Sequence, residues 1–146
     1  MKSFNIIKAS FIITLLFTTN LAFSQNPVNW TKEQLMEPSE LAQALQTKKE
    51  VPVIISVGPG AVIPGSVATG PLKEASSLDK LKSELGSLNK DTAVVIYCGC
   101  CPFDHCPNVR PAIALLKELN FTNYKLLNLK QNVKTDWLDK GYPSMK

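Results

Sequence analysis

Apolar residues occur along this chain in short continuous runs, separated by segments in which they recur at helical spacing. VPVIISV at 51–57 and TAVVIYC at 92–98 are rich in β-branched residues, which is typical of strands buried on both faces of a sheet. YKLLNL at 124–129 predicts a third strand, and the turn-rich segment before residue 71 favours a short strand at 66–69. The pattern therefore predicts several short strands spread along the chain.

The segments between these strands are amphipathic. In 76–88 the leucines recur every three or four residues with charges between them, and 111–121 repeats that spacing. A short helix is expected to begin near Ser39, and a terminal helix is expected at 134–143, closed by glycine and proline. Strands that alternate with helices predict a single α/β domain, with a central parallel sheet flanked by helices on both faces.

The first residues have the pattern of a secretory signal peptide. Two lysines accompany an apolar stretch around 11–17, and a small-x-small sequence, Ala-Phe-Ser, ends at residue 24. We expect cleavage before Gln25, so that 1–24 is removed and 25–146 forms the mature domain. The protein is then periplasmic or secreted, without a stable membrane anchor, in a compartment where disulfides persist.

The charge of the chain changes this picture little. The formal net charge is +4, and removing Lys2 and Lys8 with the signal peptide leaves +2. The remaining lysines are spread along the sequence rather than gathered in one motif. A net positive charge this small does not predict a nucleic-acid partner.

All four cysteines and the only histidine of the chain lie within one nine-residue segment, CGCCPFDHC at 98–106. This segment follows a predicted strand and precedes a predicted helix. In open parallel sheets, ligands bind beyond the carboxyl ends of the strands. The segment is therefore the candidate functional site.

Five short segments, taken in order, resemble a single rhodanese domain, the fold of a family of sulfurtransferases. They are VPVIISV at 51–57, VIPGS at 62–66, VVIYC at 94–98, AIALLKELNFTNYKLLNL at 112–129 and WLDKGYP at 137–143. The last segment is similar to the W-x-x-x-G-x-P sequence that closes the family's domain. The resemblance covers most of the predicted mature chain, and it implies a rhodanese-like fold.

The resemblance also implies an activity. In rhodanese chemistry a cysteine thiolate takes a sulfane sulfur from a donor, rests as a persulfide and passes the sulfur to an acceptor. Cys98 matches the family's catalytic position directly after the strand. Cys98 is expected to accept the sulfur, with Cys101 or Cys106 as the resolving or alternative thiol.

The neighbouring residues are expected to bind the donor. Gly99 would let the loop turn sharply and, with Cys100, bring the backbone close to the donor, while Arg110 would bind an anion such as thiosulfate. The expected partners are a small sulfur-containing anion or a thiol, together with a possible redox protein. No resident cofactor is expected.

The chain departs from the family in two places. After its early strand the family usually carries Asp-x-Arg and then Gly-His, whereas this sequence has Ser56-Val57-Gly58. The active loop is also longer than is usual in the family, because Cys98 and the expected helix start near Asn108 are ten positions apart. The scaffold thus matches the family better than the active loop does.

Two other functions remain open for the cysteine-rich loop. Export favours a non-catalytic binding module whose loop is locked by disulfides, paired as Cys98–Cys100 with Cys101–Cys106 or as Cys98–Cys101 with Cys100–Cys106. A pairing that joins the adjacent Cys100 and Cys101 would be strained. Thiolates, with His105, would also suit copper or zinc, although the ligands of a zinc site usually come from two separated segments.

Overall fold

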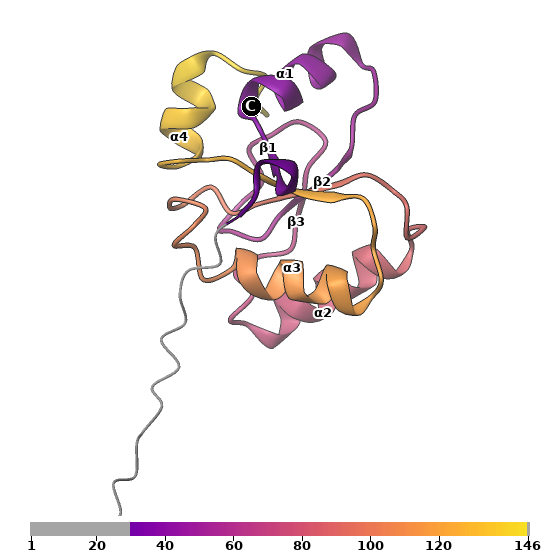
Figure 1. Cartoon of the computed structure of the whole chain (residues 1–146). Helices are drawn as coiled ribbons and strands as arrows, with labels where there is room; N and C mark the ends of the chain where they lie inside the picture. Colours follow the sequence, from indigo (N-terminus) through magenta and orange to yellow (C-terminus); the bar gives the residue numbers. More distant parts are fainter. Residues whose placement is uncertain (1–29, 146) are drawn as a thin grey trace, which may run out of the picture.

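The computed structural model describes residues 30–145, and its centre is a sheet of five parallel strands (Figure 1). The strands are β1 (Leu35–Met36), β2 (Val53–Ser56), β3 (Val67–Ala68), β4 (Val94–Tyr97) and β5 (Tyr124–Leu127). Their order across the sheet is β1-β5-β4-β2-β3. β4 is therefore the middle strand, paired with β5 on one side and with β2 on the other.

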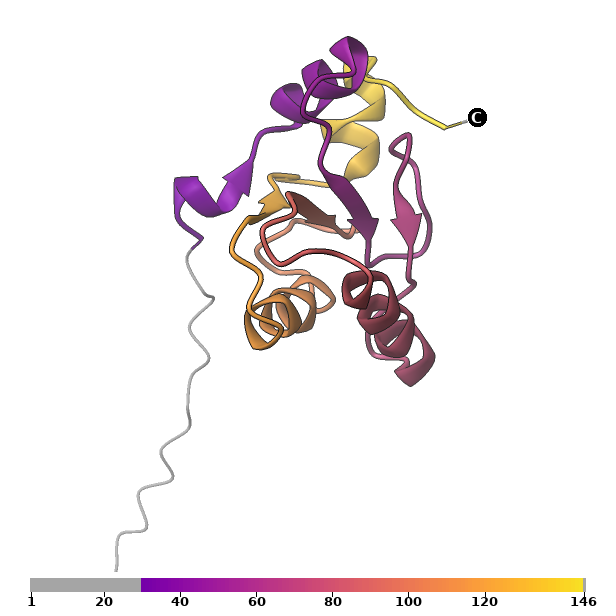
Figure 2. The same ribbon diagram turned by 90° about the vertical axis from the view of Figure 1, so that its right-hand side faces the viewer.

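Helices cover both faces of this sheet (Figures 1 and 2). Two of them lie side by side on one face, and the other two lie over the opposite face. The first pair is α2 (Ala75–Gly86) and α3 (Val109–Glu118), and the second pair is α1 (Pro38–Thr47) and α4 (Val133–Asp136). The predicted architecture, a single α/β domain with a central parallel sheet and helices on both faces, is confirmed.

The side chains of β4 alternate between two hydrophobic cores, because successive residues of a strand point to opposite faces. Val94 and Ile96 belong to the core beneath α2 and α3, whereas Val95 and Tyr97 belong to the core beneath α1. All four side chains are buried, which explains why the sequence of this strand is continuously apolar. A strand held on both faces gives the residue that follows it, Cys98, a well-defined position.

Most predicted elements are present, with small shifts of their ends. The strands predicted at 51–57 and 92–98 correspond to β2 and β4, each shorter at both ends than predicted. The helix predicted at 111–121 is α3, which begins two residues earlier, at Val109. The sequence pattern does not predict β1, which pairs with β5 at one edge of the sheet. Two residues are too few to produce a detectable alternation of polar and apolar positions.

The single terminal helix predicted at 134–143 is wrong. α4 ends before Trp137, whose φ of −129° and ψ of −62° interrupt the helix, and a 3-10 turn, η2 (Leu138–Lys140), follows it. Trp137 is fully buried, and its indole N–H donates to the carbonyl of Pro143 at 2.6 Å. Burial of this large side chain therefore overrides the local preference for a continuous helix.

Within the described residues, no helix is long and apolar enough to cross a membrane. The predicted signal peptide at 1–24 lies outside these residues, as does the start of the predicted mature domain. Cleavage, export and the boundary at residue 25 stay predictions.

Candidate functional site

Cys98 directly follows the central strand, at the carboxyl edge of the sheet, and only 4% of the residue is exposed. The chain that leaves the neighbouring strand β2 passes very close to it. A Cβ atom placed on Gly58 would overlap the carbonyl oxygen of Cys98 and lie 3.1 Å from its Sγ. Only glycine fits at position 58 without moving Cys98. The glycine in Ser56-Val57-Gly58, where the sequence departs from the rhodanese family, therefore suits this close approach.

Gly99 turns the chain sharply after Cys98, as predicted. Its φ of +83° lies in the left-handed region, which glycine enters without strain. The Gly99 carbonyl accepts a hydrogen bond from the backbone N–H of Val133 at 2.9 Å, which ties the loop to the start of α4. The turn brings the sulfur of Cys100 back to 3.2 Å from the sulfur of Cys98.

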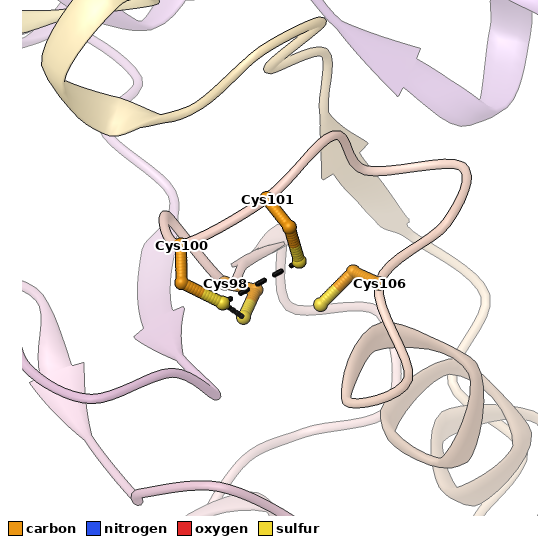
Figure 3. Close-up of side chains that lie close together, drawn as sticks. All are labelled: Cys98, Cys100, Cys101 and Cys106. Carbon is orange, nitrogen blue, oxygen red and sulfur yellow. Dashed lines mark hydrogen bonds between the residues drawn. The ribbon is translucent and has the colours of Figure 1, made fainter.

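The loop gathers the four cysteine side chains into one cluster, hereafter the thiol cluster (Figure 3). All four sulfur atoms lie within 4.8 Å of one another, and the sulfurs of Cys100 and Cys101 are 3.4 Å apart. Cys98 and Cys106 are buried, Cys101 is half-buried and Cys100 is exposed, so the cluster opens to solvent beside Cys100. All four are free thiols in the described chain.

Cys106 lies close to Cys98 although it comes eight residues later in the sequence, because the loop between them is anchored to the rest of the fold. The backbone N–H of Phe103 donates to the carbonyl of Leu129 at 3.0 Å, just beyond β5. The Phe103 side chain packs against the core beneath α2 and α3, and the Cys106 N–H donates to the Phe103 carbonyl at 3.4 Å. The extra length of the loop therefore forms an ordered turn that delivers a second buried sulfur.

Asn108 is a residue of this site that the sequence analysis did not assign to it. Its Oδ1 accepts the backbone N–H of Leu72 at 3.0 Å, and its Nδ2 donates to the Sγ of Cys98 at 3.6 Å. Asparagine just before a helix usually predicts a capping side chain. Here Asn108 occupies the N-cap position of α3 but makes no capping hydrogen bond, because its amide is turned toward Leu72 and Cys98.

Hydrogen bonds to the sulfur of Cys98 favour its thiolate form. The pKa of Cys98 is lowered to about 5, chiefly by a hydrogen bond from the thiol of Cys106. Burial acts in the opposite direction. Further hydrogen bonds from Asn108 and from the thiol and backbone N–H of Cys100 also lower this pKa. Donation to Cys98 raises the pKa of Cys106, with burial acting in the same direction. These hydrogen bonds therefore favour a thiolate at Cys98, with the thiol of Cys106 as a donor to it.

The sulfur of Cys100 is turned toward the cluster although the residue as a whole is exposed (Figure 3). Burial of this sulfur, followed by its hydrogen bonds to Cys98 and Cys101, raises the pKa of Cys100 to about 12. Cys100 is therefore a proton donor to Cys98 at neutral pH rather than a second thiolate.

The polar side chains of His105 and Arg110 both contact Asp104. The guanidinium of Arg110 donates to the backbone carbonyl of Asp104 at 3.0 Å, and His105 pairs with the Asp104 carboxylate at 2.8 Å. Within residues 30–145, no hydrogen bond joins either side chain to a cysteine sulfur. Anion binding by Arg110 stays a prediction.

Two cavities adjoin the thiol cluster. One, of about 230 Å³, is lined by Cys98 and Cys100 together with Tyr97 and other residues. The other, of about 420 Å³, is lined by Cys100, Asn108 and Lys73 among others. Cys100 thus lies between the two cavities, and Lys73 supplies a cation that the sequence analysis did not associate with the site.

The fold and the site together define an α/β protein with a four-thiol cluster at the carboxyl edge of its parallel sheet. No protein-family model matches the chain, and no curated protein matches it. Membership of the rhodanese family therefore stays a proposal.

Proposed function

We propose that the protein is a rhodanese-like sulfur carrier in which Cys98 accepts a sulfane sulfur and passes it to an acceptor. One observation carries the proposal. The Cys98 sulfur follows the central strand and receives hydrogen bonds from the Asn108 amide, at the start of α3, and from the backbone N–H of Cys100. Donors placed in this way stabilise an anionic sulfur, which is the attacking species in sulfur transfer. The five segments that resemble the family support the same class.

In the first step the Cys98 thiolate attacks the outer sulfur of the donor. A sulfur–sulfur bond forms on Cys98 while the donor's own bond to that sulfur breaks, so that thiosulfate leaves as sulfite. The negative charge moves to the outer sulfur of the new persulfide, and no external oxidant is required. The hydrogen-bond donors that hold the thiolate remain beside the persulfide.

In the second step a thiolate of the acceptor attacks the outer sulfur and restores the Cys98 thiolate. The sulfur of Cys100 lies 3.2 Å from the sulfur of Cys98, so Cys100 joins Cys101 and Cys106 as a candidate for the resolving role. Attack by Cys100 on the inner sulfur would release sulfide and leave a Cys98–Cys100 disulfide, which a redox partner would then reduce.

The donor fits the site as a small anion. The cavity beside Cys98 is about 230 Å³, which suits a molecule of a few heavy atoms rather than a peptide. Lys73 lines the adjoining cavity together with Cys100 and offers a positive charge to such a donor. If the predicted export occurs, the carrier works in the periplasm or outside the cell, with a small thiol or a redox protein as acceptor.

Persulfide mapping tests the proposal. The reduced full-length chain is treated with thiosulfate labelled in its outer sulfur, the thiols are blocked, and the peptides are mapped by mass spectrometry. We expect one labelled sulfur on Cys98, which is lost after a small thiol is added. Cys98→Ser removes the label, whereas the matched control Cys101→Ser keeps it. Label on another cysteine only, or on none, would overturn the proposal.

A further inference from the structure

We propose that the thiol cluster is a binding site for one Zn²⁺ ion, held by the sulfurs of Cys98, Cys100, Cys101 and Cys106. This goes beyond the proposed sulfur carrier, because it assigns a joint role to all four thiols. It also differs from the sequence-based expectation, in which zinc ligands from separated segments were missing. In the folded protein, one long loop brings all four ligands together without a second segment.

The sulfur positions match the size of a tetrahedral zinc site. With Zn–S bonds of about 2.3 Å, a regular tetrahedron places its sulfurs roughly 3.8 Å apart. The separations in the thiol cluster begin at 3.2 Å and do not exceed 4.8 Å, so they bracket that value. Tetrahedral sites of four sulfurs are typical of zinc or iron–sulfur chemistry, and a cluster this small suits a single ion.

Backbone hydrogen bonds are already directed at two of the sulfurs. The N–H of Cys100 donates to the sulfur of Cys98, and the N–H of Asn108 donates to the sulfur of Cys106. In both cases the donor lies two positions after the cysteine. Such outer donors orient thiolate ligands and spread their negative charge.

Within the described residues, no protein cation is hydrogen-bonded to the thiol cluster, and Lys73 lines the adjoining cavity instead. Arg110 and His105 are both engaged by Asp104. Zinc binding requires all four thiols to lose their protons, and four thiolates packed this closely would repel one another without a compensating charge. A divalent ion supplies that charge at the centre of the cluster, while the displaced protons pass to the buffer.

The site has an entry route and a closed interior. Cys106 and Cys98 are buried at the base, and the exposed Cys100 lies at the opening between the two cavities. An ion can therefore bind Cys100 first and then reach the buried sulfurs. A bound ion engages the same sulfur lone pairs that sulfur transfer requires, so zinc and a persulfide on Cys98 exclude each other.

Metal binding to the reduced full-length chain tests the site. The chain is titrated with Co²⁺ as a spectroscopic probe and then with Zn²⁺ in competition. We expect one ion per chain, intense visible bands of tetrahedral Co²⁺, sulfur-to-cobalt charge-transfer bands, and zinc-edge X-ray absorption with four sulfurs at about 2.3 Å. Bound zinc should also protect all four thiols from a chromogenic disulfide reagent. No binding, or an ion held by fewer than four sulfurs, would overturn the proposal.

Two variants complete the experiment. Cys100→Ser removes an exposed ligand that the core does not need for packing, so the fold is retained. The affinity for zinc should fall by more than about tenfold, because even the loss of a residue that only hydrogen-bonds to a metal ligand costs that much. His105→Ala is the control, since its side chain is 75% exposed and not a ligand, and binding should not change. Unchanged binding in Cys100→Ser, or lost binding in His105→Ala, contradicts the four-sulfur site.

Cys101→Ser separates this inference from the proposed function. The variant should bind zinc more weakly and still form the persulfide on Cys98. If wild-type protein accepts sulfur but binds no zinc, only the metal site falls. If it binds zinc through four sulfurs but accepts no sulfur after the metal is removed, only the sulfur carrier falls.

Discussion

The side-chain amide of Asn108 lies between the backbone of Leu72 and the sulfur of Cys98, with which it makes one hydrogen bond each. Because the Leu72 N–H engages the carbonyl oxygen, the amide nitrogen is oriented toward the sulfur. Asn108 thus links the segment before α2, the start of α3 and the end of β4 at a single buried position. This arrangement supports an anionic sulfur without using a charged side chain.

Asn108→Asp should raise the pKa of Cys98. An aspartate oxygen can still accept the Leu72 N–H, but the variant has no donor for the sulfur and adds a negative charge beside it. The rate of alkylation of Cys98, measured against pH, should therefore shift its midpoint upward. An unchanged midpoint would show that Asn108 does not stabilise the thiolate.

Asn108→Ala separates this electrostatic effect from folding. The substitution leaves the buried N–H of Leu72 without its partner, which costs about 1–3 kcal/mol of unfolding free energy. Urea unfolding measures that loss. A loss well below this range would contradict the assigned hydrogen bond between the Leu72 N–H and the Asn108 amide oxygen.

Alkylation of Cys98 should depend on pH with a midpoint far below that of an ordinary thiol. The pKa of Cys98 is lowered to about 5 in the folded protein, from 9.0 for an unperturbed cysteine. The thiolate is therefore present at neutral pH and becomes protonated as the pH falls through 5, where the rate should decrease. Cys100, with its pKa raised to about 12, should react slowly over the same range.

Peptide mapping after brief treatment with iodoacetamide identifies which cysteine reacts. The urea-unfolded chain is the matched control, because unfolding removes the hydrogen bonds and returns the midpoint to the ordinary range. A midpoint near 8 or above in the folded protein, on the scale of an ordinary thiol, would contradict the thiolate assignment.

The sequence was sufficient to predict the fold class and the position of the cysteines in the fold. The runs that became β2 and β4 are continuously apolar because both faces of the sheet are covered, and that pattern is local. The cysteines adjoin such a run, so their position at the carboxyl edge followed from a general rule for parallel sheets. Both inferences needed only neighbouring residues.

The details that required distant partners could not be predicted. The role of Asn108 depends on Leu72, 36 positions away, and the need for glycine at position 58 depends on Cys98, which follows another strand. The convergence of the four sulfurs depends on Phe103, which is anchored to Leu129 beyond β5. None of these relationships leaves a periodic pattern in the sequence.

Gly58→Ala should destabilise the protein and disturb Cys98. The new methyl group would overlap the carbonyl oxygen of Cys98, which belongs to the backbone and cannot rotate away. Overpacking of this kind costs about 1–3 kcal/mol. Gly86→Ala is the matched control, because that position has no neighbouring atom within 4 Å and lies at the end of α2.

Urea unfolding and the alkylation profile of Cys98 together measure this effect. Alanine at 86 should leave both unchanged or add about 0.5–1 kcal/mol of stability, since alanine favours a helix over glycine. Alanine at 58 should lower stability and alter the reactivity of Cys98. Equal behaviour of the two variants would mean that the close approach at Gly58 has no role in positioning the sulfur.

Tyr97→Phe should destabilise the loop that forms the far wall of the cavity beside Cys98. The buried Tyr97 hydroxyl accepts the backbone N–H of Val62 at 2.9 Å and lies 3.1 Å from the hydroxyl of Ser66. Removing it leaves a partly buried N–H without a partner, at a cost of about 1 kcal/mol or more in unfolding free energy. Tyr124→Phe is the control, because this half-buried tyrosine packs against the core through its ring, and its effect should stay within about 0.5 kcal/mol.

The pKa of Cys98 provides the second measurement for Tyr97→Phe. The Tyr97 hydroxyl contacts the segment at Val62–Ser66, whereas the donors to the Cys98 sulfur come from the loop and from Asn108. The alkylation midpoint of Cys98 should therefore stay where it is in the wild type, even though stability falls. A shifted midpoint at unchanged stability would mean that the thiolate depends on this cavity wall, and the assignment of its donors would have to be revised.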